Sequence, residues 1–265
     1  MNRKFAICYN PLMDNSKDVM QELKHLLDLQ GVNSEILSID SLKSDYEFVF
    51  VIGGDGTILK AARFYSEFNT PIFGVNLGRL GFLSQASRDN LDFAVSQILN
   101  DNFKIEKRMM LKCQNNVALN DFVIKGDVLS RTSRFALQIN DKFVCEYLAD
   151  GIIISTPTGS TAYGMAAGGP VLSPVVQAIT IVPVCPHTFS ARPIVVSADD
   201  KIKILSCPNQ KYIVSADGQN IFTFSDDLII EKSENCANLA LLNENDFYSV
   251  LRNKLHWGIS PACIK

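Results

Sequence analysis

Residues 48–65 read FVFVIGGDGTILKAARFY, and this stretch decides the fold of the first part of the chain. Its apolar beginning predicts a buried strand, whereas residues 58–65 carry apolar side chains at helical spacing. A strand that runs through glycines into a helix is typical of an α/β sheet. The start of such a helix attracts anions, because its first N–H groups lack partners within the helix. Residues 53–57 are therefore expected to hold phosphate oxygens.

Asp55 lies inside this glycine-rich turn, although a carboxylate repels phosphate. Its presence favours proton abstraction from a hydroxyl, or contact with Mg²⁺ bound to a phosphate. Asp55-Gly56 could also be a two-residue hairpin turn. The helical spacing that follows argues against that alternative, because a returning strand would alternate. Neither G-x-x-x-x-G-K-[ST] nor a G-x-G-x-x-G after the first strand occurs.

The composition describes an ordinary globular protein. The chain has 265 residues, of which 47% are hydrophobic and 20% charged, and its length predicts one or two domains. A formal net charge of −3 gives no electrostatic reason to expect a nucleic acid partner. Seven cysteines without C-x-x-C spacing predict neither a zinc site nor a disulfide framework, which favours the reducing cytoplasm. The apolar runs are too short for a signal peptide or a membrane span.

Residues 1–100 alternate between strand and helix patterns, which predicts an open, Rossmann-like α/β domain. The expected elements, strands and helices together, lie at residues 5–9, 16–30, 32–38, 48–52, 57–67, 71–75 and 90–99. Ligands bind beyond the carboxyl ends of strands in such sheets. Two glycine-bearing loops, residues 53–57 and 76–83, are expected to emerge there.

Residues 101–244 consist of short β-rich segments separated by turn residues, which predicts a second domain of β-sandwich type. The expected strands lie at residues 104–113, 117–124, 134–140, 143–147, 151–155, 178–182, 193–197, 201–206, 211–215, 228–231 and 239–242. The tail, residues 245–265, carries an amphipathic helix pattern that Asp246 opens as an N-cap. We expect this tail to return to the first domain.

Residues 150–170, DGIIISTPTGSTAYGMAAGGP, form a second motif-like segment. A strand ends in hydroxyl side chains, Pro157 fixes a turn, and a short helix follows. Read alone, this pattern fits a capped ordinary helix and a ligand site equally well. Five hydroxyls and one aromatic ring at a single helix start favour a nucleotide site.

The chain resembles the NAD kinase family over most of its length. The first motif alone also occurs in lipid kinases, but six motifs in order are specific to the NAD kinases. These motifs are residues 53–57, 76–82, 118–121, 150–170, 186–193 and 215–219. The resemblance implies transfer of phosphate from ATP to the 2′-hydroxyl of the adenosine ribose of NAD⁺, with Mg²⁺ or another divalent cation on the nucleotide. It also implies a homodimer or homotetramer. The net charge and the short apolar runs, as noted above, predict neither nucleic acid nor membrane as partner.

The resemblance further implies roles for individual residues. Asp55 resembles the general base, Gly56 lines the phosphate site, and Lys60 offers a cation one helical turn further on. Asn120 and Asp121 match the pair that binds the ribose and diphosphate of NAD. Asp150 matches the group near the nicotinamide, Arg131 a basic position that reaches a neighbouring subunit's nucleotide, and Leu148 and Ala166 depart from the family pattern. The remaining expected binding residues are Phe82, Thr158, Thr161, Ala162, Tyr163, Gly164, Met165, Ala166 and Gln219.

Several motifs also have simpler structural interpretations. Without the resemblance, Asn120-Asp121 is more simply a turn, Asp217-Gly218 a hairpin turn, and His187 a structural residue. Two other functions compete with the kinase: a diacylglycerol-type lipid kinase and a non-catalytic NAD(H)-binding sensor. Hydroxyl-rich residues 155–163 argue against an apolar acceptor pocket, and retention of Asp55 argues for turnover.

Overall fold

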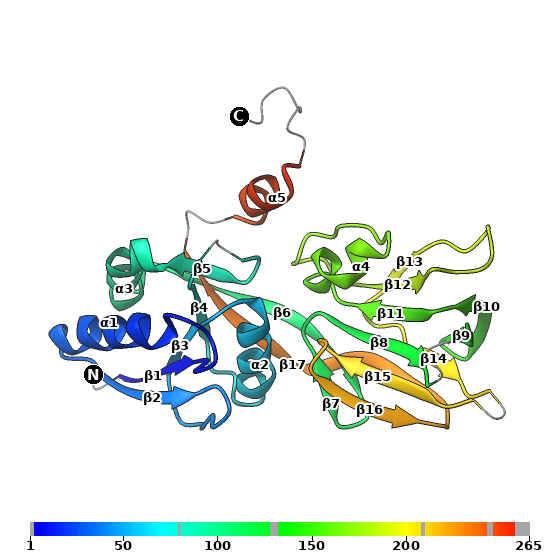
Figure 1. Ribbon diagram of the computed structural model, residues 1–265, viewed down its shortest axis with the longest axis horizontal. Coiled ribbons are helices and arrows are strands. Elements are labelled where there is room, and N and C mark those ends of the chain that lie inside the picture. Colours follow the sequence, from blue (N-terminus) through cyan, green and yellow to red (C-terminus); the bar gives the residue numbers. More distant parts are fainter. Residues whose placement is uncertain (1–2, 79–80, 128–131, 208–209, 243–245, 258–265) are drawn as a thin grey trace. The chain divides into compact units, whose positions relative to one another are not determined.

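The computed structural model describes residues 3–78, 81–127, 132–207, 210–242 and 246–257 (Figure 1). It divides into two compact units: unit 1 is Met1–Lys107 with Ala237–Lys265, and unit 2 is Arg108–Cys236. The sequence placed the change of character at residue 100 and the end of the second domain at residue 244. The structural divisions instead fall inside two long strands, β6 (Lys104–Cys113) and β17 (Leu228–Leu241), because each strand begins in one unit and ends in the other.

Unit 1 contains a parallel sheet in the order β17-β4-β3-β1-β2, with β5 paired to β4. Only the end of β17 belongs to this sheet. The other strands are β1 (Lys4–Tyr9), β2 (Asn33–Ser38), β3 (Phe48–Ile52), β4 (Ile72–Asn76) and β5 (Ser84–Ser87). Strand β3 is buried throughout, as a parallel strand covered on both faces requires. The α/β class predicted for this part of the chain is confirmed.

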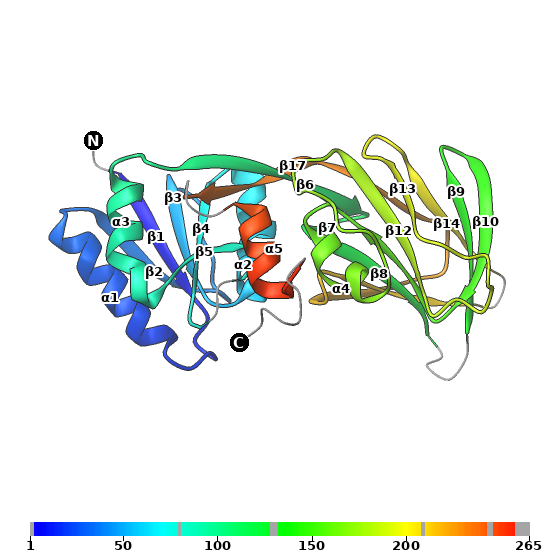
Figure 2. The same ribbon diagram turned by 90° about the horizontal axis from the view of Figure 1, so that it is seen from above.

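Helices cover both faces of this sheet. α1 and α3 run side by side and share one core with alternate strand residues such as Phe5 and Phe50 (Figure 2). Cys8 points to the opposite face by strand alternation, and its thiol lies 3.4 Å from the hydroxyl of Tyr65 in α2. The helices of unit 1 are α1 (Ser16–Leu29), α2 (Asp55–Tyr65), η1 (Ser66–Phe68), η2 (Arg88–Asn90), α3 (Leu91–Leu99) and α5 (Phe247–Leu255).

Unit 2 is a β-sandwich. One sheet has the antiparallel order β13-β12-β11-β8-β15-β16, and the other runs β10-β9-β14-β17, while β6 pairs with β7 and β17. Inward residues of both sheets, such as Phe122 and Phe135, form one core. The strands, in chain order, are β7 (Asn116–Ala118), β8 (Asp121–Gly126), β9 (Ser133–Ile139), β10 (Lys142–Ala149), β11 (Gly151–Ser155), β12 (Ala178–Val184), β13 (Ile194–Ser197), β14 (Ile202–Leu205), β15 (Tyr212–Ala216) and β16 (Asn220–Phe224).

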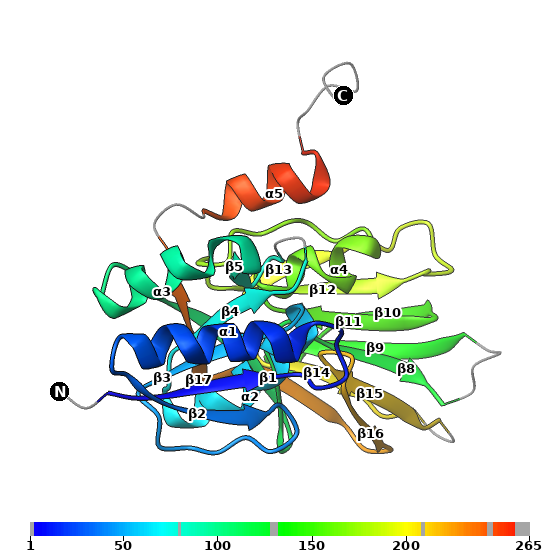
Figure 3. The same cartoon turned by 60° about the vertical axis from the view of Figure 1, so that its left-hand side comes forward.

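Two expectations about individual strands were wrong, and two strands were not predicted. The segment 117–124, expected as one strand, is broken at residues 119–120 into β7 and β8. Strand β17 is continuous, whereas the sequence predicted two short strands at residues 228–231 and 239–242. Strands β5 and β16 were missed. β5 has the polar sequence SQAS, and β16 pairs with β15 across the turn that begins at Asp217 (Figure 3).

Two short helices follow β11: η3 (Gly159–Thr161) and α4 (Tyr163–Ala166). The sequence predicted one short helix there, and the structure divides it at Ala162, whose backbone is not helical. Within the described residues, no helix combines the length and the apolar character that crossing a membrane requires.

Candidate active site

Helix α2 begins at Asp55, directly after the glycines that follow strand β3. The Asp55 carboxylate accepts hydrogen bonds from the backbone N–H of Phe82 at 3.1 Å and of Leu83 at 3.3 Å. These bonds join the loop that carries residues 53–57 to the loop that precedes β5. The two glycine-bearing loops therefore meet at Asp55, as their position after neighbouring parallel strands predicted.

Gly81 makes the close approach of these loops possible. A Cβ atom at Gly81 would overlap Oδ1 of Asp55, so any other residue would push the two loops apart. The N–H of Gly81 in turn donates to the hydroxyl of Ser84 at 2.6 Å, which fixes the backbone just before β5. The carboxylate of Asp55 is thus held by the chain itself, while its side chain remains 33% exposed.

Two lysines of unit 1 differ from what the sequence predicted for the phosphate site. Lys60, which the sequence placed as a cation near the phosphate site, forms an exposed ion pair with Asp40 at 2.6 Å. Lys254 of α5, which the sequence did not single out, has its ammonium 4.0 Å from Oδ2 of Asp55 and 5.2 Å from the ring centre of Phe82. Only a tertiary contact could identify Lys254, because about two hundred residues separate it from Asp55.

In unit 2, Asp217 fixes the backbone at the break between β7 and β8. Its carboxylate accepts hydrogen bonds from the N–H groups of Leu119 at 3.1 Å, Asn120 at 2.7 Å and Asp121 at 3.3 Å. The N–H of Asp217 donates to the carbonyl of Asp121 at 2.9 Å. Asp217 and Gly218 have φ values of 51° and 67°, so they do form the expected tight turn. The sequence did not predict the hydrogen bonds between Asp217 and residues 119–121, because the long-range partners of a turn residue leave no periodic signal.

Asp121 lies in an unusual electrostatic environment. Its side chain is only 4% exposed, and burial, reinforced by the neighbouring carboxylate of Asp217, raises its pKa to about 7. Ordinary carboxylic acids ionise near pH 4. Asp121 therefore exchanges its proton close to neutral pH, a property of functional groups more often than of structural ones.

The loop after β11 packs against the same corner. The Thr156 hydroxyl donates to the carbonyl of Leu119 at 2.6 Å, and the Thr156 N–H donates to the carbonyl of Asn120 at 2.9 Å. A Cβ atom at Gly159 would overlap that Asn120 carbonyl, so this position requires glycine. Residues 119–121 are thus fixed from two directions, by Asp217 and by residues 155–159.

The five hydroxyls of this loop have partners within the protein. Those of Ser155, Thr156 and Ser160 bond to backbone groups, such as the carbonyl of Pro157 at 2.6 Å from Ser160. Thr158 accepts from buried Arg108 at 3.3 Å, and Thr161 donates to the carbonyl of Thr158 at 3.2 Å. Each of the five hydroxyls thus takes part in hydrogen bonds that build the loop.

The remaining expected site residues lie in several places. Tyr163 is 40% exposed, and the ammonium of Lys125 lies 5.9 Å from its ring centre. Asp150 is exposed before β11, and its N–H donates to Val184 at 3.0 Å. Gln219 ends the turn of Asp217, and Arg131 falls outside the described residues. The rest occupy the short helices or the residue between them: Ala162, Gly164, Met165 and Ala166.

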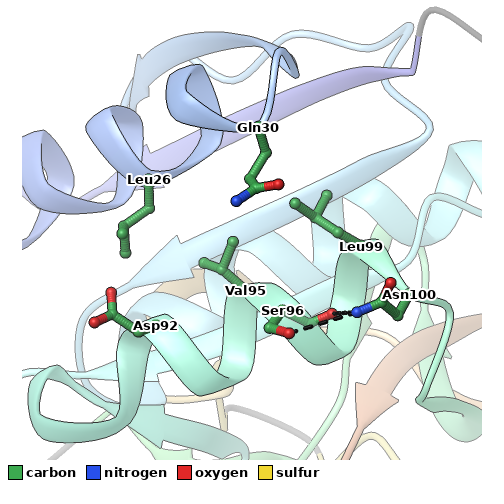
Figure 4. Close-up of a pocket in the computed structure, with 7 residues that line it drawn as sticks. All are labelled: Leu26, Gln30, Asp92, Val95, Ser96, Leu99 and Asn100. Carbon is green, nitrogen blue, oxygen red and sulfur yellow. Dashed lines mark hydrogen bonds between the residues drawn. The ribbon is translucent and has the colours of Figure 1, made fainter.

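A separate cavity of about 310 Å³ lies between α1 and α3 (Figure 4). Asn100 donates to the carbonyl of Ser96 at 2.9 Å on its wall. The lining residues are Leu26, Gln30, Asp92, Val95, Ser96, Leu99 and Asn100, none of them expected at the site. This cavity is therefore distinct from the Asp55 corner.

Comparison with known proteins defines the class. Residues 12–103 match the family model of the ATP-NAD kinase N-terminal domain, and residues 119–242 match that of the ATP-NAD kinase C-terminal domain. An NAD kinase of Thermoanaerobacter sp. (strain X514) is 42% identical over 224 residues, which cover 80% of this chain and 79% of the relative. An NAD kinase of Azotobacter vinelandii is 40% identical over 243 residues, 87% of this chain and 82% of the relative.

Solved structures agree with this assignment. The structure of an NAD kinase from Archaeoglobus fulgidus in complex with ATP has a TM-score of 0.82 at 27% identity, covering 96% of this chain and 98% of that chain. A yeast NADH kinase has the same fold, with a TM-score of 0.86 at 24% identity over 99% of this chain and 90% of that chain. The chain belongs to the ATP-NAD kinase family, a class of ATP-dependent phosphotransferases.

Proposed function

We propose that this chain transfers the γ-phosphate of ATP to the 2′-hydroxyl of the adenosine ribose of NAD⁺, with Asp55 as general base. The coarser activity, phosphorylation of NAD by ATP, follows from membership of the family. The observation that carries the finer proposal is the carboxylate of Asp55. It begins α2 in a glycine-rich corner, where helix amides favour phosphate, and two backbone N–H groups hold it in place.

The proposed reaction is a direct phosphoryl transfer. The 2′-oxygen forms a bond to the γ-phosphorus, and the bond from that phosphorus to the bridging oxygen of ADP breaks, so that its electron pair leaves with ADP. The proton of the 2′-hydroxyl passes to Asp55. Gly56 and the neighbouring amides at the start of α2 would bind phosphate oxygens, and Lys60 would add positive charge further along the helix.

Unit 2 is proposed to bind the dinucleotide. Asn120 and Asp121 would hold its ribose and diphosphate, and Asp150 would lie near the nicotinamide. Asp217 supports the first assignment, because it fixes the backbone that carries Asn120 and Asp121. Arg131 would reach the nucleotide of a neighbouring subunit, and Thr158 is a further proposed binding residue. The proposed adenine-side loop is Thr161, Ala162, Tyr163, Gly164, Met165 and Ala166, with Phe82 and Gln219 as neighbours.

We also propose that Mg²⁺, or another divalent cation, arrives on the phosphates of ATP. The described residues hold no cluster of three or more His, Cys, Asp or Glu side chains that could bind an ion by themselves. Mg²⁺ usually keeps several waters and is bound through one or two carboxylates together with substrate phosphates. Such a cation would screen the charge of the phosphates.

A homodimer or homotetramer in the cytoplasm is the proposed state of the protein. Edge strands of unit 2 expose large apolar side chains: Phe143 of β10 is 64% exposed, Val195 of β13 49% and Ile221 of β16 69%. Exposed apolar edges favour pairing with another chain. The six cysteines within the described residues are free, which suits a reducing compartment.

One assay tests this function against its competitors. Purified protein is incubated with NAD⁺, ATP and Mg²⁺, and NADP⁺ is measured with an NADP-dependent dehydrogenase. Formation of NADP⁺ with release of ADP is the expected result. Binding of NAD⁺ without turnover would identify the sensor, and phosphorylation of diacylglycerol instead of NAD⁺ would identify the lipid kinase. Parallel reactions with polyphosphate and with NADH define the donor and the acceptor.

A further inference from the structure

Helix α5 lies outside the two family models, because the residues that they match end at 242. Its nine residues form a helix with an N-cap and a buried apolar side. Asp246 caps its start by accepting from the N–H groups of Tyr248 at 2.8 Å and Ser249 at 2.9 Å, and Val250 and Leu251 are buried. Its last turn carries two basic residues, Arg252 and Lys254.

The two basic residues have different surroundings. Lys254 has its ammonium 4.0 Å from Oδ2 of Asp55 and 5.2 Å from the ring centre of Phe82, and its side chain is 34% exposed. Arg252 is exposed. The helix dipole favours a basic residue anywhere in this last turn, so it does not explain why Lys254 lies beside Asp55. A partly exposed ion pair also stabilises a fold only weakly.

The proposed reaction develops negative charge that the ammonium of Lys254 could stabilise. When the 2′-oxygen attacks, its proton moves to Asp55, the bond from the γ-phosphorus to ADP breaks, and negative charge spreads over the three equatorial phosphoryl oxygens. Those oxygens surround the phosphorus that bonds to the 2′-oxygen, so they come close to the carboxylate that takes the proton. The ammonium of Lys254 lies 4.0 Å from that carboxylate, on the side where this charge would develop in the proposed step.

We propose that Lys254 is a catalytic residue that donates hydrogen bonds from its ammonium to the transferring phosphoryl group. In the proposed step Lys254 acts only as a hydrogen-bond donor and transfers no proton, so it adds none to the balance of the reaction. The ring of Phe82 provides a second contact, which holds the ammonium near Asp55 before ATP arrives. This inference rests on the proposed function, because it takes Asp55 as the base for the hydroxyl that is phosphorylated.

Three variants test the role: Lys254→Met, Lys254→Arg and, as a matched control on the same turn, Arg252→Met. Loss of one donor to a developing charge typically lowers kcat by about 10²–10³-fold, and we expect a decrease of that order for Lys254→Met. Lys254→Arg should recover part of the loss, because it keeps the charge. The KM for NAD⁺ should stay close to that of the parent in both variants. Arg252→Met should match the parent in every parameter.

Two controls separate the possible outcomes. Circular dichroism melting checks that each variant is folded, and a lower melting temperature with parental kcat for Lys254→Met would overturn the proposal. Calorimetric titration with ATP, without NAD⁺, needs no turnover, and Lys254→Met should bind ATP more weakly than Arg252→Met. A parent that binds ATP but forms no NADP⁺ would refute the proposed function, whereas equal ATP binding and equal kcat in Lys254→Met and the parent would refute the role of Lys254 alone.

Discussion

At the scale of single residues, three aspartates have three different environments. Asp55 is partly exposed and held by two backbone N–H groups. Asp217 is buried and accepts from three backbone N–H groups, which compensates its loss of water. Asp121 is also buried, but the negative charge of Asp217 lies beside it. The same side chain can therefore act as a base, a structural acceptor and a group that titrates near neutrality.

Asp55→Asn should retain the fold and the binding of NAD⁺ but lose turnover. The amide has nearly the same shape as the carboxylate, yet it cannot accept the proton of the 2′-hydroxyl. General-base catalysis typically contributes about 10²–10⁴-fold, and kcat should fall by that order. The coupled NADP⁺ assay measures the loss, and calorimetry measures NAD⁺ binding. A variant that kept a rate close to that of the parent would show that Asp55 is not the base.

Asp121→Asn should change how stability depends on pH. The folded pKa of Asp121, about 7, lies above its unfolded value near 4, so its contribution to stability is fully present below about pH 4 and is lost as the pH rises to about 7. The variant lacks this loss, so its stability relative to the parent should rise between pH 5 and pH 8, by roughly 1.4 kcal/mol for each unit by which the folded pKa exceeds the unfolded one. Urea unfolding at pH 5 and pH 8 provides the measurement.

The exposed position Asp226 provides the control for that experiment. Asp226→Asn should follow the pH profile of the parent. If Asp121→Asn gains no stability over the parent between pH 5 and pH 8, the buried carboxyl is not the titrating group. If the variant also shows a raised KM for NAD⁺, Asp121 lowers the stability of the protein while it contributes to NAD⁺ binding, a trade-off that is common at functional sites.

At the scale of elements, the corner between β7 and β8 depends on partners far along the chain. Leu119 and Asn120 break a strand that the sequence predicted as continuous, because their N–H groups bond to Asp217 rather than to a neighbouring strand. Thr156 takes up the carbonyl oxygens of the same two residues. The backbone is thus fully paired at this corner although it follows no regular ladder.

Asp217→Asn should therefore affect the proposed site for the acceptor, NAD⁺, rather than the site for ATP. An amide at 217 offers one oxygen, and its NH₂ group would face N–H donors that need an acceptor. Each lost charged hydrogen bond costs on the order of 1.5–3 kcal/mol, so both stability and the KM for NAD⁺ should suffer. The KM for ATP should change less. Steady-state kinetics with each substrate varied in turn measure the difference.

Asp227 offers a matched control for this variant. Its carboxylate accepts from the N–H of Ser206 at 2.9 Å, and Asp227 is exposed in the same unit. Asp227→Asn should leave the KM for NAD⁺ as in the parent. Equal increases in the KM for NAD⁺ and for ATP in Asp217→Asn would argue against the assignment of Asn120 and Asp121 to the acceptor.

At the scale of the whole molecule, the edge strands predict association. A strand edge that exposes Phe143 or Ile221 invites pairing with another chain, and such edges are usually covered in stable proteins. Light scattering of the purified protein should give a mass that is a multiple of 29.3 kDa at the concentrations used for assays. A fully active species of 29.3 kDa throughout that range would rule out the proposed homo-oligomer.

The sequence by itself determined the class of fold and the family. The buried run of residues 48–52, followed by glycines and a helical pattern, specifies a parallel strand and its crossover helix, because both are local patterns of period and burial. The short, alternating strands of unit 2 are local signals as well. Asp55 could be singled out for the same reason. A carboxylate is unexpected in a turn that is predicted to bind anions, and that turn is only five residues long.

Only the tertiary structure decided which distant groups meet. Asp217 reaches the backbone of residues 119–121, Lys254 reaches Asp55, and Gly81 allows Phe82 to bond to that same carboxylate. None of these contacts leaves a periodic trace, because each depends on one side chain and a long return of the chain. The pKa of Asp121 is likewise a property of burial and of a neighbouring charge, both of which arise only when the chain has folded.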